Sequence, residues 1–408
     1  MEKLPEGWRW VRLGEVCEHN SGIWGDEPDV SPECHFILRS NNIKDGKMIF
    51  DKIAIRKVKS KYLATKSLKL GDILVTTSSG SKNLLGKSAI FIPPDDKIYL
   101  FSNFTMRLRA KLEIIDYFYL YFCLQSPEAK GILQLIQDTT TGLRNLDRKE
   151  FLNQFIPLPP IKEQKRIATK IQELMQEVGR ARTACEKQLE SAKTLPTAYL
   201  RQIFESKEAK KWERRRLGEV ARIFTGSSAP QEPKYFENGK HPFVRVQDLG
   251  RYGKTINLMD VKDYINDSAI KEINLVKAEK GNILFPKSGA AITTNNRAIL
   301  GIDAFIVSHL AAVKPISEIA DVHFAYYWLC LTDMVQYMEN PGYPSLKLST
   351  ISKIFISLPS LEVQRRIATE LGEKMAEVQN LQFSIHNQQS ALNALPQAIL
   401  RKAFKGDL

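Results

Sequence analysis

Cysteine is scarce in this chain of 408 residues, which has five, widely scattered and with no two forming a CxxC pair. An odd number without ligand spacing argues against both a disulfide framework and a structural zinc site. The six histidines also lack the spacing typical of metal ligands. We therefore expect no metal ion, and a reducing compartment such as the cytoplasm.

Long hydrophobic runs are missing as well. The longest aromatic and apolar run, 117–124, is far shorter than the roughly 20 residues that a membrane-spanning helix needs. The opening segment, MEKLPEGWRW, has no apolar stretch followed by a cleavage site, so it predicts no secretion signal. These features favour a protein that does not act in a membrane.

Nucleotide-binding and catalytic motifs are absent. The chain contains no GxG, no HExxH, no GxSxG and no Asn-Pro-Pro-aromatic signature of amino-methyltransferases. Segment 80–88 (GSKNLLGKS) resembles a phosphate-binding loop, but five residues separate its glycines where the motif has four. We therefore expect no cofactor, no catalytic residue and no enzyme activity in the isolated chain.

Basic residues outnumber acidic ones, which gives a formal charge of +13. The excess is spread along the chain and is not concentrated in a basic tail. This distribution favours folded surfaces that face a polyanion such as DNA, although charge alone does not separate DNA-binding proteins from other basic proteins.

The chain is a tandem repeat. Segment 8–16 (WRWVRLGEV) matches 212–220 (WERRRLGEV), and 156–169 (IPLPPIKEQKRIAT) matches 356–369 (ISLPSLEVQRRIAT). A third pair joins 195–204 (LPTAYLRQIF) to 395–404 (LPQAILRKAF). Each half is thus a divergent body followed by a well-matched tail. We predict bodies at residues 1–160 and 207–360, and tails at 161–206 and 361–408.

Both tails are predicted to be long helices, because apolar residues recur at alternating steps of four and three, the pattern of a coiled-coil seam. A narrow apolar stripe needs a partner, and the other tail is favoured over each helix's own body. The residues predicted to pair the helices are Ile167, Ile171, Leu174, Val178, Cys185, Gln188, Ile367, Leu371, Val378, Leu381, Ile385 and Gln388. Antiparallel pairing would bury Gln188 and Gln388 as a polar pair that fixes register. Pro196 and Pro396 are expected to break or restart the helices.

The bodies have a mixed pattern of helix and strand. Strand-like runs occur at 35–38, 73–76, 88–92 and 104–108 in the first body, and at 243–246, 283–285 and 298–302 in the second. Helices are predicted at 115–124, 127–136 and 322–331, with a further element at 334–338. The predicted fold class is α+β: two globular domains in tandem, separated by two long helices that form an antiparallel coiled coil with pseudo-two-fold symmetry.

These motifs resemble the specificity subunit of type I restriction-modification systems. The LPxGWxxxxLGEV opening, the GDIL-type strand and the LPPIKEQKRIA tail occur in the family's order, and the repeat covers nearly the whole chain. The second tail departs at Ser360 and Val363 but keeps Gln364, Arg366, Ile367 and Ala368. The resemblance implies two target-recognition domains, each reading half of a bipartite sequence in double-stranded DNA. It also implies spacer helices that dock methyltransferase subunits, expected to be two, and a translocase-endonuclease subunit that joins for restriction.

Candidate DNA contacts follow from chemistry, since the domains of this family vary with their targets. Polar loops rich in cations, amides and hydroxyls suit phosphates and base edges. Ordinary surface loops are the alternative. The candidates in the first body are Arg39, Asn41, Asn42, Thr77, Ser78, Ser79, Ser81, Lys82, Asn83, Lys87, Thr140, Thr141, Arg144 and Asn145. Those in the second body are Arg245, Gln247, Lys287, Ser288, Thr293, Thr294, Asn295, Asn296, Arg297, Tyr343, Ser345 and Lys347. Arg39 and Arg245 are the foremost candidates, because each follows a matching strand.

Two other functions stay open from the sequence. A stand-alone DNA-modifying enzyme would turn over DNA without partners. A coiled-coil scaffold would bind no DNA, although it would have no need of two divergent bodies of about 150 residues.

Overall fold

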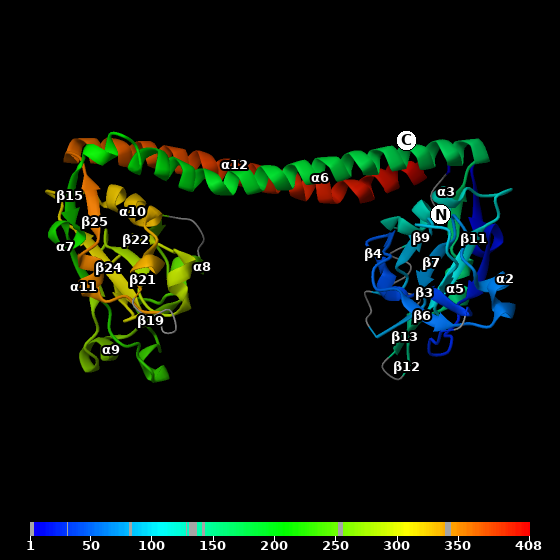
Figure 1. Ribbon diagram of the computed structural model, residues 1–408, viewed down its shortest axis with the longest axis horizontal. Coiled ribbons are helices and arrows are strands. Elements are labelled where there is room, and N and C mark those ends of the chain that lie inside the picture. Colours follow the sequence, from blue (N-terminus) through cyan, green and yellow to red (C-terminus); the bar gives the residue numbers. More distant parts are fainter. Residues whose placement is uncertain are drawn as a thin grey trace. The chain divides into compact units, whose positions relative to one another are not determined.

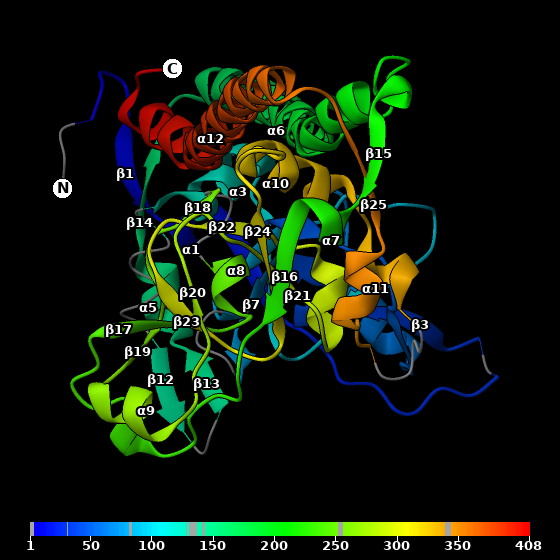
Figure 2. The same ribbon diagram turned by 90° about the vertical axis from the view of Figure 1, so that its left-hand side faces the viewer.

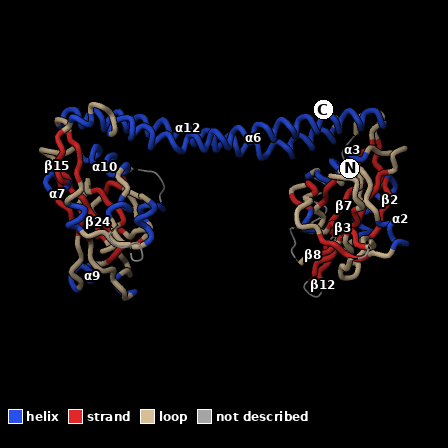
Figure 3. The backbone as a smooth tube through the Cα atoms, viewed as in Figure 1, coloured by secondary structure: helices blue, strands red, loops and turns tan. Residues whose placement is uncertain are grey.

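The computed structural model describes residues 4–30, 32–80, 84–127, 129, 137–140, 143–251, 256–338 and 344–408. The chain divides into two compact units: unit 1 comprises residues 1–186 and 387–408, and unit 2 comprises residues 187–386. Each unit therefore contains one body together with parts of both long helices. Strands form the interior of each unit and helices lie around them (Figure 3).

Unit 1 is built from short strands and a few helices (Figure 1). Its strands are β1 (Arg9–Arg12), β2 (Cys17–Ser21), β3 (Cys34–Leu38), β4 (Ile43–Lys44), β5 (Lys47–Met48), β6 (Ala54–Lys57), β7 (Ile73–Thr76), β8 (Ser78–Ser79), β9 (Ser88–Ile90), β10 (Tyr99–Phe101), β11 (Thr105–Ala110), β12 (Gln137–Thr140), β13 (Leu143–Leu146) and β14 (Phe155–Leu158). Its helices are α1 (Leu13–Val16), α2 (Leu63–Lys66), α3 (Tyr117–Gln125), α5 (Arg148–Asn153) and the first part of α6 (Ile161–Phe204). The main sheet has the order β2-β11-β7-β9, and smaller sheets are β10-β3-β6, β12-β13-β8, β1-β14 and β4-β5.

Unit 2 repeats this plan with larger sheets. Its strands are β15 (Glu213–Arg216), β16 (Ala221–Thr225), β17 (His241–Val244), β18 (Asn257–Leu258), β19 (Asp263–Ile265), β20 (Lys277–Ala278), β21 (Ile283–Pro286), β22 (Ala298–Leu300), β23 (Ala304–Ile306), β24 (Leu310–Pro315) and β25 (Phe355–Leu358). Its helices are α7 (Leu217–Val220), α8 (Asp248–Arg251), α9 (Asp267–Glu272), α10 (Val322–Leu331), α11 (Leu348–Ser352) and the first part of α12 (Leu361–Lys405). The sheets are β16-β24-β21-β22-β18, β19-β17-β23-β20 and β15-β25, and α10 lies between the first of them and α12 (Figure 2).

Most predicted elements are present, including β7 and α10 with the predicted bounds. The predicted helix 127–136 falls mostly outside the described residues. The LGEV motif forms α1 and α7, whose leucine and valine side chains are buried. In α7 the glycine is needed, because a Cβ on Gly218 would lie 2.9 Å from Cβ of Ser352 at the end of α11. The motif thus allows a close approach of two short helices.

The matched glutamine of the tails joins each long helix to its body. Gln164 is 1% exposed; its Oε1 accepts the N–H of Asp116 at 2.9 Å, and its Nε2 donates to the carbonyls of Ile114 and Pro159. Gln364 makes the same three bonds to Asp321, Ile319 and Pro359. Because Asp116 and Asp321 cap α3 and α10, each glutamine ties the start of a long helix to a cap within its own unit.

The long helices pair antiparallel within each unit. In unit 1, Arg166 on α6 donates to the carbonyl of Leu408, just beyond the end of α12, and Arg182 on α6 donates to that of Leu392 on α12. As the residue number rises on one helix it falls on the other, so the helices run in opposite directions. Buried positions recur every seven residues, at Ile171, Val178, Cys185 and Ala192 on α6 and at Leu371, Val378 and Ile385 on α12. The predicted antiparallel coiled coil is therefore confirmed.

Two details of the helix prediction were wrong. Gln188 and Gln388 are exposed and form no buried polar pair; Leu381 is also exposed, at 45%. At these three positions the half-buried residue lies four residues after the buried one, and not three: Leu189 follows Cys185, Gln382 follows Val378 and Gln389 follows Ile385. Pro196 lies inside α6, and Pro396 inside α12, so neither proline ends its helix. Bonds from the opposite helix compensate for the N–H groups that the prolines lack, as described below.

Candidate nucleic-acid interface

Two of the three predicted polar stretches meet in each unit. In unit 1, β8 pairs with β13, which places Ser79 opposite Arg144 and Ser78 opposite Asn145. In unit 2, Ser288 forms a β-bridge with Ser345. The backbone bond from Leu146 to Thr77 in unit 1 corresponds to the bond from Leu346 to Lys287 in unit 2. Both units therefore build the same polar edge from segments that lie far apart in the sequence.

The arginines predicted to lead each interface occupy the same local turn. The backbone N–H of Arg39 donates to Oδ1 of Asn42 at 3.0 Å, and that of Arg245 donates to Oδ2 of Asp248 at 2.7 Å. Both side chains are half-buried. The turn follows β3 in unit 1 and β17 in unit 2. The two units therefore place an arginine on the same backbone turn, although the sequences around the two turns differ.

Arg245 is held firmly in unit 2. Its Nε forms an ion pair with Asp263, and its guanidinium lies over the rings of Phe236 and Phe243, 5.7 and 5.5 Å from their centroids. It lines one groove of about 390 Å³ with Lys262 and Asp263. Ring stacking and the ion pair restrict its rotamers, which prepares a planar donor for a base edge or a phosphate.

The polar stretch 287–297 of unit 2 also reaches this arginine. A second groove, of about 500 Å³, is lined by Arg245, Gln247, Thr294, Asn296 and His309. Gln247, Thr293, Thr294 and Asn295 are exposed, and Asn295 donates to the carbonyl of Cys330. His309 Nδ1 lies 2.5 Å from Oγ of Ser288, which connects this groove to the polar edge. Unit 2 therefore gathers cations, amides and hydroxyls from three segments.

Three residues predicted to contact DNA are buried, so the prediction was wrong for them. Asn42 is 2% exposed, and its Nδ2 bonds the carbonyls of Ile49 and Asp51, so its amide serves the turn. Thr77 is 3% exposed. Arg297 is 6% exposed and lies over the ring of Phe285, and burial lowers its pKa to about 10.

The remaining candidates for DNA contacts differ in their exposure and in their location. Asn41, Asn145 and Lys347 are exposed, and Ser78, Ser79, Arg144, Lys287, Ser288, Asn296 and Ser345 are half-buried. Ser81, Lys82, Asn83, Thr141 and Tyr343 lie outside the described residues, as does the side chain of Thr140. Lys87 is half-buried and lines a groove of about 730 Å³ with Lys47 and Arg182, so it faces the helix pair and is separate from the polar edge.

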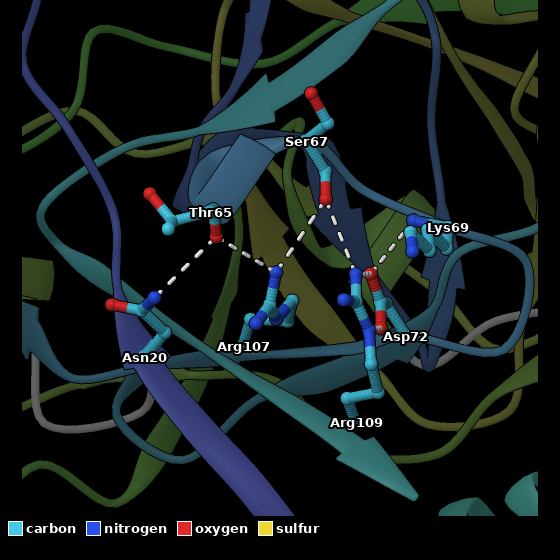
Figure 4. Close-up of polar contacts among 7 residues, drawn as sticks. All are labelled: Asn20, Thr65, Ser67, Lys69, Asp72, Arg107 and Arg109. Carbon is cyan, nitrogen blue, oxygen red and sulfur yellow. Dashed lines mark hydrogen bonds and ion pairs between the residues drawn. The ribbon is translucent and has the colours of Figure 1, made fainter. Parts of the chain in front are cut away.

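Sequence reasoning missed a buried polar cluster in unit 1 (Figure 4). Asp72 is 1% exposed and accepts two bonds of 2.7 Å from Arg109, while a third comes from the N–H of Lys69. Arg107 is 4% exposed and donates to the carbonyl of Thr65 at 3.0 Å; burial lowers its pKa. The cluster fixes loop 65–72 on β11. The clue in the sequence was the alternation TMRLRA, which places two arginines on one face of a strand.

The part of the chain that the structure describes contains neither a cluster of metal-ligating side chains nor a helix that could span a membrane. No group of three or more histidine, cysteine or acidic side chains is placed to hold a metal ion there. Among those same residues, no helix has the length and apolar character needed to cross a membrane.

Comparison with known proteins gives one consistent result. The family model described as the type I restriction modification DNA specificity domain matches residues 5–189 and again 209–390. The MjaIX specificity subunit of Methanocaldococcus jannaschii, a type I restriction enzyme component, is 25% identical over 438 residues, which covers 100% of this chain and 94% of that protein. The EcoKI specificity subunit of Escherichia coli K12 is 25% identical, covering 100% of this chain and 90% of its own.

Solved structures agree in fold. A chain from a structure concerned with complex assembly and conformational transition of the type I R-M system matches with a TM-score of 0.76 and 26% identity, and each chain is covered completely. The HsdS subunit of Thermoanaerobacter tengcongensis matches with a TM-score of 0.70 and 25% identity, over 100% of this chain and 99% of that one.

Proposed function

Because the chain belongs to the family of type I restriction-modification DNA specificity subunits, we propose that its two units read the two halves of a bipartite sequence in double-stranded DNA. The observation that carries this proposal is the duplicated polar edge. The same backbone arrangement presents different side chains in the two units, such as Asn145 and Asp147 in unit 1 against Ser345 and Lys347 at the matching positions of unit 2. One frame with two unlike sets of polar groups suits two unlike half-sites.

Direct reading is assigned to residues 1–160 and 207–360, the target-recognition domains, and spacing to the helices at 161–206 and 361–408. Arg39 and Arg245 contact base edges in this proposal, and serines, threonines and lysines of the polar edges contact phosphates. A helix of 44 residues is roughly 66 Å long, so a continuous α6 can hold two readers several base pairs apart.

Catalysis is assigned to partner subunits. A specificity subunit recognises the sequence, and methyltransferase subunits, two of them in this proposal, supply the methyl donor and the transfer chemistry. A translocase-endonuclease subunit joins them for restriction. Exposed apolar side chains on α12 support a docking role for the helices: Leu381 is 45% exposed and Phe383 is 69% exposed. Because the proposed target is double-stranded DNA, we expect the complex to work in the cytoplasm.

Exchange of one unit's reading surface tests the proposal. The chain is assembled with its methyltransferase subunits, and methylated sites are mapped on genomic DNA with S-adenosylmethionine present. Replacement of residues 207–360 by the corresponding domain of a relative should change one half of the methylated sequence and leave the other half unchanged. If both halves change, the units do not read independently. If the chain alone methylates or cleaves DNA in the presence of S-adenosylmethionine, ATP and magnesium, it is an enzyme and the proposal fails.

A further inference from the structure

The prolines inside α6 and α12 leave particular backbone carbonyls without a helical partner. Proline has no N–H, so the carbonyl four residues earlier loses its bond. For Pro196 that carbonyl belongs to Ala192, and for Pro396 it belongs to Leu392. Ala192 is 1% exposed. A buried carbonyl without a hydrogen bond destabilises the fold, so another donor is needed.

The opposite helix supplies the donor in both cases. In unit 2, Nε2 of Gln382 on α12 donates to the carbonyl of Ala192 on α6 at 3.1 Å. In unit 1, Nη2 of Arg182 on α6 donates to the carbonyl of Leu392 on α12 at 3.1 Å, and to that of Asn393 at 3.4 Å. Arg182 and Gln382 occupy equivalent positions of the repeat, as do Ala192 and Leu392. The same contact is therefore made twice, once within each unit.

This arrangement selects one register. Most other carbonyls in the middle of a helix are already bonded to an N–H four residues on, so a side-chain donor from the opposite helix contributes most at the carbonyl that the proline frees. Sliding one helix by a turn would move Gln382 or Arg182 to a carbonyl that is already satisfied, and would leave the free carbonyl unbonded. The apolar positions recur every seven residues and discriminate less well between registers one heptad apart.

We propose that Arg182 and Gln382 are positioning residues for DNA recognition: each bonds the carbonyl that a proline frees on the opposite helix, and together they hold the helix pair in one register and so set the distance between half-sites. The statement about half-sites rests on the proposed function. The statement about register does not, and the two can be tested separately.

Hydrogen exchange tests the bonds themselves. The full chain, assembled with its methyltransferase subunits, is compared as wild type, Gln382→Ala, Pro196→Ala and the double variant. Loss of Gln382 should speed amide exchange in residues 190–200 about 5- to 10-fold, since one hydrogen bond is lost. In the Pro196→Ala background the same loss should change exchange less than 2-fold, because the substituted alanine supplies the missing N–H. Arg182→Ala and Pro396→Ala should couple in the same way for residues 390–400, with Gln388→Ala as the exposed control. If the effects simply add, the proline-linked bonds do not hold the helices.

Binding tests the consequence for spacing. The Arg182→Ala, Gln382→Ala double variant is titrated with DNA whose half-sites are moved apart or together by one and two base pairs. We expect its preference for the native spacing to fall at least 5-fold relative to wild type, while binding to each isolated half-site stays unchanged. Coupled exchange with an unaltered spacing preference would overturn the role in spacing. A wild-type complex without any spacing preference would refute the proposed function, and the exchange experiment would still decide whether the bonds fix the register.

Discussion

Replacement of Arg245 by alanine should weaken recognition of one half-site and leave the other intact. Asp263 binds the Nε of this arginine, and the rings of Phe236 and Phe243 flank its guanidinium. The terminal Nη groups of an arginine held this way suit a bidentate bond to O6 and N7 of guanine. One such contact contributes about 1–3 kcal/mol, so affinity for the cognate sequence should fall about 5- to 150-fold.

The assay is competition binding with three DNAs: the cognate sequence, a sequence with the half-site of unit 1 scrambled, and one with the half-site of unit 2 scrambled. The Arg245→Ala complex should lose affinity for the cognate DNA, and for DNA that keeps the half-site of unit 2. It should bind like wild type to DNA in which that half-site is scrambled. Arg245→Lys should not restore specificity, because an ammonium group is a point charge without the planar fork.

Two controls separate base reading from other roles. Asp263→Asn removes the ion pair and keeps the arginine, so thermal unfolding of both variants shows how much of the loss comes from stability. A phosphate contact would instead weaken all sequences alike and reduce the salt dependence of binding by about one charge. Equal losses on both scrambled DNAs would refute base reading by Arg245.

Three further predictions concern the frame that holds the interface. Gln164→Ala, or Gln364→Ala, should lower the free energy of unfolding of its unit by about 3 kcal/mol, because three backbone groups lose their hydrogen-bond partner. Amide exchange that stays unchanged in α3 or α10 would contradict this prediction. Asp72→Ala should lower the free energy of unfolding of unit 1 by about 3 kcal/mol, because it removes the buried partner of Arg109. Asp72→Asn should lower it less, because unit 2 has Asn282 at the matching position, and equal unfolding temperatures for the two variants would argue against the ion pair. Burial raises the pKa of Cys17 from 9.0 to about 12, so the folded chain keeps a proton that the unfolded chain loses, and the free energy of unfolding should fall as the pH rises from 9 towards 12. Rapid alkylation of Cys17 in the native chain at pH 8 would contradict this, because it would show that the thiol is accessible.

The repeat and the helices could be predicted because their signals are local or duplicated. Two copies of the same tail predict two equivalent helices, and the apolar spacing predicts that they pair. The strand β7 was predictable because four apolar or β-branched residues follow a Gly-Asp turn. Each of these signals comes from residues that are close together in the sequence, or from a second copy of the same segment.

The errors arose where a distant residue changes the outcome. Pro196 would break an isolated helix, but a side chain almost two hundred residues later bonds the carbonyl that it frees. Gln188 matched the seam at three-residue steps, yet the buried face follows Leu189. Arg297 looked like a surface cation, and only the tertiary structure places it over Phe285. Sequence patterns describe the chemistry of such residues without showing what covers them.

The most direct test of the whole account lengthens both helices together. Seven residues of helical sequence are inserted after Glu186 in α6 and seven after His386 in α12, where the chain divides between the units, so that antiparallel register is preserved. Each insertion adds roughly 10 Å of helix, equivalent to about 3 base pairs of DNA. Methylation mapping of the assembled complex should recover the same two half-sites with about 3 more base pairs between them. The same half-sites at the original spacing would contradict the claim that the paired helices set the distance between the two readers.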